Sequence, residues 1–162
     1  MNKVFFDLEW NTGFLDGNSF DEIIEIGAVK TDEEYRQIDG FRRLIRPVIY
    51  RKMNPYIQKI LAITMKDLQG EEPLASVAKA FFDWCGDCDT LIAWSGNDFG
   101  VLEKNLAHIG MKIPEQLGRY DVQMAYAYRT ENSIRNYALK AAVEAMELPE
   151  PEGQEYHDAY CD

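Results

Sequence analysis

A short alternating segment near the start of the chain constrains the fold most. In residues 3–10, Phe5, Asp7 and Glu9 share one face of a predicted strand, and the apolar side chains of Val4, Phe6, Leu8 and Trp10 share the other. A strand this apolar is expected inside a sheet, where its two acids need partners. The Cα atoms of Asp7 and Glu9 would lie about 6.6 Å apart, so both carboxylates could reach one pair of metal ions. The alternative is an exposed edge strand with both acids in water.

Length and composition predict one domain spanning residues 1–162. A chain of 162 residues with 46% hydrophobic content can bury a full core, and no run approaches the roughly 18 apolar residues of a membrane span. Asp7 and Glu9 interrupt the N-terminus before a secretory signal could develop, and three cysteines make no disulfide framework. We therefore expect a cytoplasmic protein without membrane partners.

The charge is acidic overall and uneven along the chain. A net charge of −11 argues against a protein that coats long nucleic acids. Between Arg36 and Lys52, however, six basic residues stand against one acid, a net charge of +5. This segment is either a phosphate-facing patch or a strand and loop with solvated arginines.

The periodicity predicts a mixed α/β chain. Strands are expected at residues 3–10, 23–30, 40–46 and 90–94, with a turn-rich loop from Asn11 to Glu22. Helices are expected at residues 73–84 and after the segment 94–98, the second one ending near Gly110. A third helix is expected to open at Ser133, with a buried face of Ile134, Tyr137, Ala138, Ala141, Ala142, Ala145 and Leu148, and to break at residues 149–153.

Three further residues are candidates for chemistry. Asp98 follows an apolar strand where a helix begins, so it either offsets the helix dipole or joins Asp7 and Glu9 at a strand end. Asp162, taken alone, is expected to be a frayed terminal acid without a special role. On one regular helix His157 would lie about 140° from Asp162, so His157 is expected on the preceding loop, where it could act as a general base. His108 reads as a helix-end residue that suits the dipole.

Four ordered segments across nearly the whole chain resemble the DEDDh 3′-to-5′ exonuclease family (DnaQ-like). They are F-D-L-E-W with Asp7 and Glu9, I-I-E-I-G-A-V at 23–29, W-S-G-N-D-F-G-V-L with Asp98, and H-D-A-Y-C-D with His157 and Asp162. Trp94 before Asp98 is more like the branch of KapD and the histone-mRNA 3′-end exonucleases. The resemblance implies a ribonuclease H-like fold, a five-stranded mixed sheet flanked by helices.

The same resemblance implies the chemistry. Asp7, Glu9, Asp98 and Asp162 would bind two Mg²⁺ or Mn²⁺ ions, and His157 would deprotonate the attacking water. The expected partners are 3′ ends of single-stranded RNA or DNA, with RNA or short oligonucleotides favoured. Substrate contacts are assigned to Leu8, Trp10, Phe99, Arg42 and Arg46.

The chain departs from the family pattern in two places that matter here. Trp10 stands where many relatives have threonine, and it is either buried opposite the carboxylates or stacked on the terminal base. The family's last helix runs beyond its final aspartate, whereas this sequence stops on Asp162, which favours a domain shortened at its C-terminus.

The motif W-C-G-D-C at residues 84–88 imitates a thioredoxin active site. Its cysteines, however, end a predicted helix instead of opening one, and nearby acids would raise the thiol pKa. Two competing functions remain: a ribonuclease H-type endonuclease, disfavoured by the H-x-A-x-x-D ending, and a catalytically quiet module that binds nucleic acid or protein, disfavoured by the complete carboxylate set.

Overall fold

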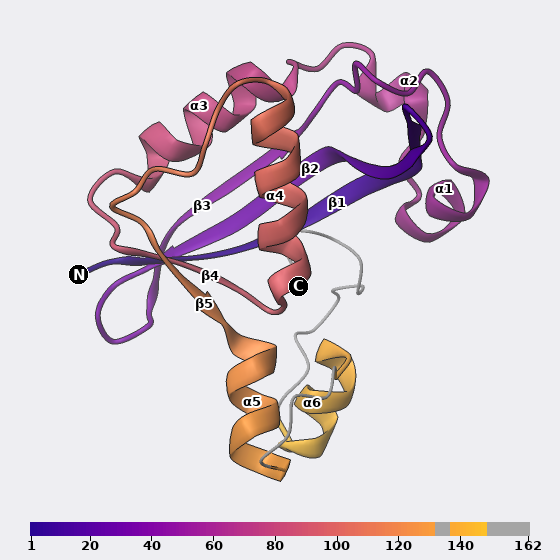
Figure 1. The fold of residues 1–162 in the computed structure, drawn as a ribbon. Coiled ribbons are helices and arrows are strands. Elements are labelled where there is room, and N and C mark those ends of the chain that lie inside the picture. The colour runs from indigo at the N-terminus through magenta and orange to yellow at the C-terminus, as the bar shows by residue number, and fades with distance from the viewer. Residues whose placement is uncertain (132–136, 149–162) are drawn as a thin grey trace.

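The computed structural model describes residues 1–131 and 137–148, and its centre is one mixed sheet (Figure 1). The strands lie in the order β3-β2-β1-β4-β5. Their bounds are β1 Lys3–Leu15, β2 Asn18–Thr31, β3 Gln37–Leu44, β4 Thr90–Ala93 and β5 Gly118–Asp121. β1 is antiparallel to β2 and parallel to β4, so the strand with Asp7 and Glu9 is central, as predicted.

The first two strands form a long hairpin, and the loop predicted from Asn11 to Glu22 is wrong. Pairing continues from Asn11↔Glu22 to Leu15↔Asn18, and only Asp16 and Gly17 form the turn. Both have positive φ, 49° and 80°, which is the geometry of a two-residue hairpin turn that favours Asp-Gly. The extension carries residues just past Glu9 that hold a later loop in place.

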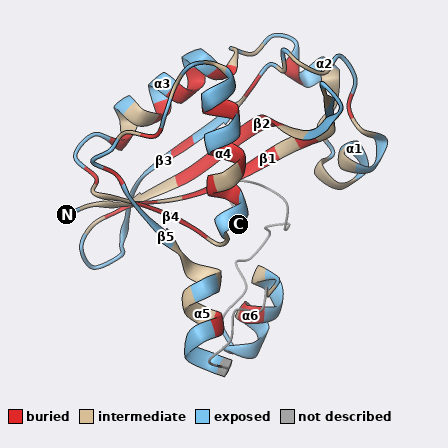
Figure 2. Cartoon of the chain, in the orientation of Figure 1, coloured by how far each residue is buried: buried red, intermediate tan, exposed pale blue. Residues whose placement is uncertain are grey.

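One face of the sheet packs on two amphipathic helices. Helices α3 (Leu74–Cys85) and α4 (Gly96–His108) confirm the two predicted helices, and α4 crosses in front of the sheet in Figure 1. Their buried side chains form one core with alternate residues of β1, such as Val4 and Phe6. Figure 2 shows the buried stretches of α3, α4 and β1 in red. Deep apolar burial on this face fixes the strand register, because a one-residue slip would expose the whole set.

The opposite face is covered by short helices. A β-bulge inserts Ile24 into β2 opposite the step from Glu9 to Trp10, and Ile24 packs with Met53 and Leu68. These contacts place α1 (Pro55–Leu61) and α2 (Met65–Leu68) at the hairpin end of the sheet. Helices α5 (Val122–Glu131) and α6 (Leu139–Ala145) lie together near β5.

The prediction for the third helix is wrong in its bounds and in its buried face. The described helix begins at Leu139 after an extended Ala138, and of its expected buried residues in the described part only Ala142 is buried. Ser133, Ile134 and the predicted break at 149–153 lie outside the described residues. Within residues 1–131 and 137–148, no helix has both the length and the apolar character that crossing a membrane requires.

Candidate active site

The two acids of the first strand lie at the centre of the sheet. Asp7 pairs across the hairpin with Gly27, and Glu9 pairs with Glu25. Directly paired residues share a face, so these carboxylates lie on the face opposite the α3–α4 core. Asp7 is partly buried and Glu9 is 9% exposed. Gly27, the residue across from Asp7, has no side chain.

Asp98 lies in the first turn of α4, which begins just past the end of β4. The Ser95 hydroxyl caps the helix by accepting from the Asn97 N–H at 3.3 Å, and it donates to Asp98 Oδ2 at 3.0 Å. Asp98 is 5% exposed. Burial raises the pKa of this carboxyl, with a smaller contribution from the charge of Asp121, and the Ser95 bond opposes the rise.

The end of β4 runs beside the acidic strand. Phe5 pairs with Ile92 in the parallel ladder, so Asp7, two residues on, lies alongside the chain that leads into α4. Asp7 and Trp94 also line the same hollow. The fold therefore brings the segment that leads into the Asp98 helix alongside the central strand that carries Asp7 and Glu9. His157 and Asp162 lie outside the described residues. Within residues 1–131 and 137–148, no three His, Cys, Asp or Glu side chains form a group that could hold a metal ion.

An apolar hollow of about 360 Å³ adjoins Asp7. Phe5, Ile92 and Trp94 contribute from the sheet face that carries the acids, and Val122 and Tyr126 contribute from α5. The indole N–H of Trp94 and the amide of Gln123 both donate to the Tyr137 carbonyl, at 3.0 and 2.6 Å. The sequence predictions did not include this hollow, although strand parity already placed Phe5 on the face of Asp7.

Two predicted substrate contacts are core residues instead. The side chains of Leu8 and Phe99 are 2% and 7% exposed and belong to the α3–α4 core, where Phe99 lies edge-on to Phe6. They are buried on the other side of the sheet from Asp7 and Glu9. Trp10 also packs partly buried against this core, and its stacking on a terminal base stays a prediction.

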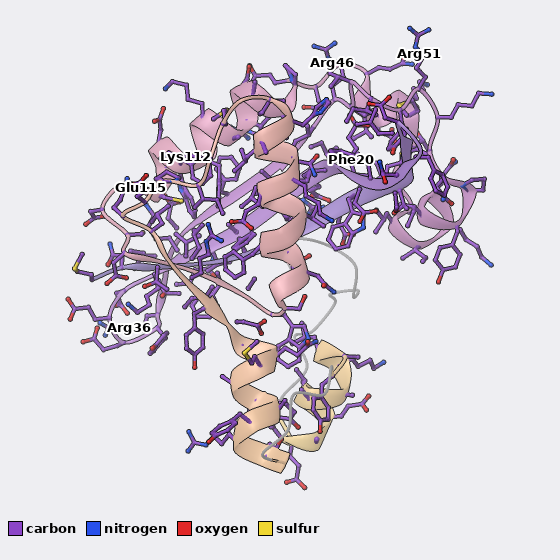
Figure 3. All side chains as sticks on the ribbon, in the orientation of Figure 1. Phe20, Arg36, Arg46, Arg51, Lys112 and Glu115 are labelled. Atoms are coloured by element: carbon purple, nitrogen blue, oxygen red, sulfur yellow. The ribbon has the colours of Figure 1, made fainter. Side chains whose placement is uncertain are left out.

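Arg42 has different surroundings from Arg46 and Arg51 in the basic segment. Arg42 donates from Nε to Glu25 Oε1 at 2.6 Å, so it forms an ion pair with a carboxylate that is 1% exposed. Arg46 and Arg51 instead line one hollow of about 470 Å³ with Tyr50, Met65 and Gln69. Both lie at the same end of the molecule in Figure 3, far from Lys112 and Glu115.

The cysteine pair at the end of α3 is unlike a redox site. Cys85 and Cys88 are buried, and burial raises the pKa of Cys85 to about 12. Burial is also the largest cause of the raised pKa of Cys88, ahead of Asp87 and Asp89. The predicted rise of the thiol pKa values is confirmed, but its main cause is burial and not the nearby acids that the sequence indicated.

Comparison with known proteins agrees with this geometry. The nuclease domain of 3′hExo, a DEDDh family member bound to rAMP, matches with a TM-score of 0.75 over 98% of this chain and 84% of that one, at 14% identity. E. coli Exonuclease I in complex with a dA16 oligonucleotide matches with a TM-score of 0.74 over 99% of this chain and 38% of that one, at 17% identity. The fold is therefore that of the ribonuclease H-like exonucleases.

The sequence comparisons define the family. A PolC-type DNA polymerase III from Clostridium perfringens (strain 13 / Type A) is 34% identical over 112 residues, which are 68% of this chain and only 7% of the polymerase. The exonuclease family model RNase_T matches residues 4–162. The chain belongs to this exonuclease family, a kind that uses divalent metal ions.

Proposed function

We propose that this protein is a metal-dependent 3′-to-5′ exonuclease that removes nucleotides from single-stranded ends. The main support is the placement of Asp7 and Glu9 on one face of the central strand, alongside the segment that leads into the helix carrying Asp98. In this proposal Asp7, Glu9, Asp98 and Asp162 hold two Mg²⁺ or Mn²⁺ ions, and His157 is the general base.

The donor set suits hard divalent cations. All four groups are carboxylates, the oxygen ligands that such ions prefer. Burial raises the pKa of Asp98, and a neighbouring dication would oppose that rise. Two bound ions would lower the pKa of a water and stabilise the entering and leaving oxygens of the phosphodiester.

Other side chains would transfer the proton and bind the substrate. An imidazole nitrogen of His157 would take the proton of the attacking water. The apolar hollow formed by Phe5, Ile92, Trp94 and Tyr126 next to Asp7 suits the flat face of a terminal base. Arg46 and Arg51 would contact the backbone phosphates of the strand. We keep RNA or short oligonucleotides as the proposed substrates.

Charge-removing variants that keep side-chain size test the proposal. Asp7→Asn, Glu9→Gln and Asp98→Asn should each fold yet fail to shorten a single-stranded oligonucleotide with Mg²⁺ or Mn²⁺, because each leaves a cation under-neutralised. Asp16→Asn is the matched control, since it removes one carboxylate from the exposed hairpin turn and should keep wild-type turnover. Near wild-type turnover of Asp7→Asn with Mn²⁺ would refute the assignment.

A catalytically quiet nucleic-acid-binding module on the same fold is the second candidate. That candidate predicts that the protein binds an oligonucleotide but does not hydrolyse it under any metal condition. The Asp7, Glu9 and Asp98 variants would then leave the oligonucleotide as intact as the unaltered protein does.

A further inference from the structure

The connection that follows β3 is fixed to the hairpin by a buried carboxylate. Glu22 Oε1 accepts from the backbone N–H groups of Val48 and Ile49 at 2.6 and 2.7 Å, and Oε2 accepts from the Tyr50 N–H at 2.9 Å. Glu22 is 4% exposed. A buried carboxylate is costly unless it is hydrogen-bonded, and these three bonds satisfy both oxygens.

Asn11 fixes the same connection further along. Its side-chain amide donates to the Lys52 carbonyl at 3.1 Å, and its side-chain oxygen accepts from the Asn54 N–H at 2.8 Å. Asn11 pairs with Glu22 in the hairpin. It is also two residues beyond Glu9 on β1, about 6.6 Å along the strand. The connection is therefore held on the sheet face that carries Asp7 and Glu9, a short distance from them.

A close ring contact completes the attachment. The Tyr50 ring lies over Gly13, where an added Cβ would come within 2.6 Å of the ring, so only glycine allows this approach. The Tyr50 hydroxyl donates to the Phe20 carbonyl at 3.0 Å. Burial raises the pKa of Tyr50, and the charges of Glu22 and Asp21 add to the rise, so this hydroxyl remains a donor at neutral pH.

The attachment determines how the basic side chains are presented. Glu22 holds the backbone of residues 48–50, and the arginines on either side of that stretch, Arg46 and Arg51, line one hollow. Arg46 Nε also donates to the Glu71 carbonyl at 3.1 Å, which holds the base of its guanidinium. Because the three Glu22 bonds all go to backbone N–H groups, they set the shape of the loop and leave the arginine charges for a ligand.

We propose that Glu22 is a positioning residue for substrate binding: it holds residues 46–52 in the shape that presents Arg46 and Arg51 together to a phosphate of the single strand. This inference rests on the proposed function, since it names what places the backbone-binding side chains next to the carboxylate site. Glu22 acts through the loop and does not touch the substrate.

The test is a double-variant cycle measured by substrate binding. Glu22→Gln keeps the size of the side chain but replaces one acceptor oxygen with an NH₂ group that cannot accept from a backbone N–H. Binding of a fluorescein-labelled 12-nucleotide single strand is measured by anisotropy, in chelator, at several salt concentrations. We expect Glu22→Gln and the double change Arg46→Ser/Arg51→Ser each to weaken binding about tenfold and to flatten the salt dependence, by up to about 1.4 in slope for two lost contacts.

The decisive comparison is Glu22→Gln in the Arg46→Ser/Arg51→Ser background. If Glu22 acts through these arginines, its change adds less than about twofold there. Full additivity would overturn the proposal, since it would mean that Glu22 supports the fold in general. Glu115→Gln is the charge-matched control: it removes a carboxylate that is paired with Lys112 at the other end of the molecule (Figure 3) and should leave binding unchanged.

Stability and turnover are measured on the same variants. Should Glu22→Gln unfold, Tyr50→Phe is the substitute, because it removes only the hydroxyl bond to the Phe20 carbonyl. It should weaken oligonucleotide binding by less than Glu22→Gln, and this loss should again be absent in the Arg46→Ser/Arg51→Ser background. With Mn²⁺, Glu22→Gln should raise KM and leave kcat within about twofold, because the four proposed metal-binding carboxylates are unchanged. Absence of hydrolysis by the unaltered chain would overturn the proposed function alone, while additivity in the binding cycle would overturn this inference alone.

Discussion

Replacing Arg42 with methionine should destabilise the fold, although the sequence pointed to Arg42 as a substrate contact. The Arg42 guanidinium bonds Glu25 on the neighbouring strand, and Glu25 pairs directly with Glu9 on the same face. Without Arg42, two carboxylates lie side by side on that face with less positive charge near them. Methionine keeps the apolar length of the side chain and removes the guanidinium group.

The size of the effect follows from the burial of the two partners. Breaking a fully buried pair by removing one charge costs about 3–5 kcal/mol. Here the Glu25 side chain is 1% exposed but that of Arg42 is 49% exposed, so water replaces part of the lost interaction. We expect a loss of about 2 kcal/mol, which lowers the Tm of a chain of this size by about 4–8 °C.

Thermal unfolding followed by circular dichroism, without metal or nucleic acid, measures this loss. Glu25→Gln combined with Arg42→Met should be more stable than Arg42→Met alone, because the buried charge of Glu25 is then absent. Arg43→Met is the control: Arg43 is exposed and lies over the Phe41 ring at 5.8 Å, so its loss should cost less than about 1 kcal/mol. An Arg42→Met variant with wild-type Tm and a raised KM would refute the reasoning and restore Arg42 as a substrate contact.

Two further predictions concern His157 and Cys85. His157→Ala should lower turnover by about 10²–10⁴-fold and leave metal affinity unchanged in calorimetry, because a general base moves a proton and binds no cation; loss of metal binding would assign it another role. With a pKa raised to about 12 by burial, the Cys85 thiol stays protonated at every pH well below 12, so alkylation of the native protein at pH 8 should leave Cys85 unmodified in mass spectrometry. Fast modification of Cys85 in the folded state would contradict that burial.

The strongly periodic elements were predictable from sequence, and the short ones were not. The alternation of residues 3–10 placed Asp7 and Glu9 on one face, and apolar stripes located α3 and α4. β5 has four residues, three of them exposed, so it carries no alternating apolar signal. The extended hairpin did have a sequence signal, the Asp16-Gly17 pair. The residues around this pair are mostly polar because most of the hairpin extension is partly or fully exposed, and such a polar stretch is typical of a loop.

Side-chain roles that depend on pairing across strands were also beyond the sequence. Arg42 bonds Glu25 only because β2 and β3 pair in the observed register, which no local pattern specifies. The burial of Leu8 and Phe99, by contrast, was predictable from sequence, because strand and helix periodicity turn both side chains into the core although each flanks an acid. Glu22 had no motif at all, because its three partners lie more than 25 residues away along the chain.

The polarity of degradation tests the central claim most directly. A single-stranded oligonucleotide carrying a 5′ label is incubated with the protein and Mn²⁺, in parallel with a 3′-blocked copy, a circular strand and a chelator control. The proposed function predicts a ladder of 5′-labelled products that shorten stepwise with time, no products from the blocked or circular strand, and none in chelator. Cleavage of the circular strand, or release of the 5′-terminal nucleotide first, would contradict it.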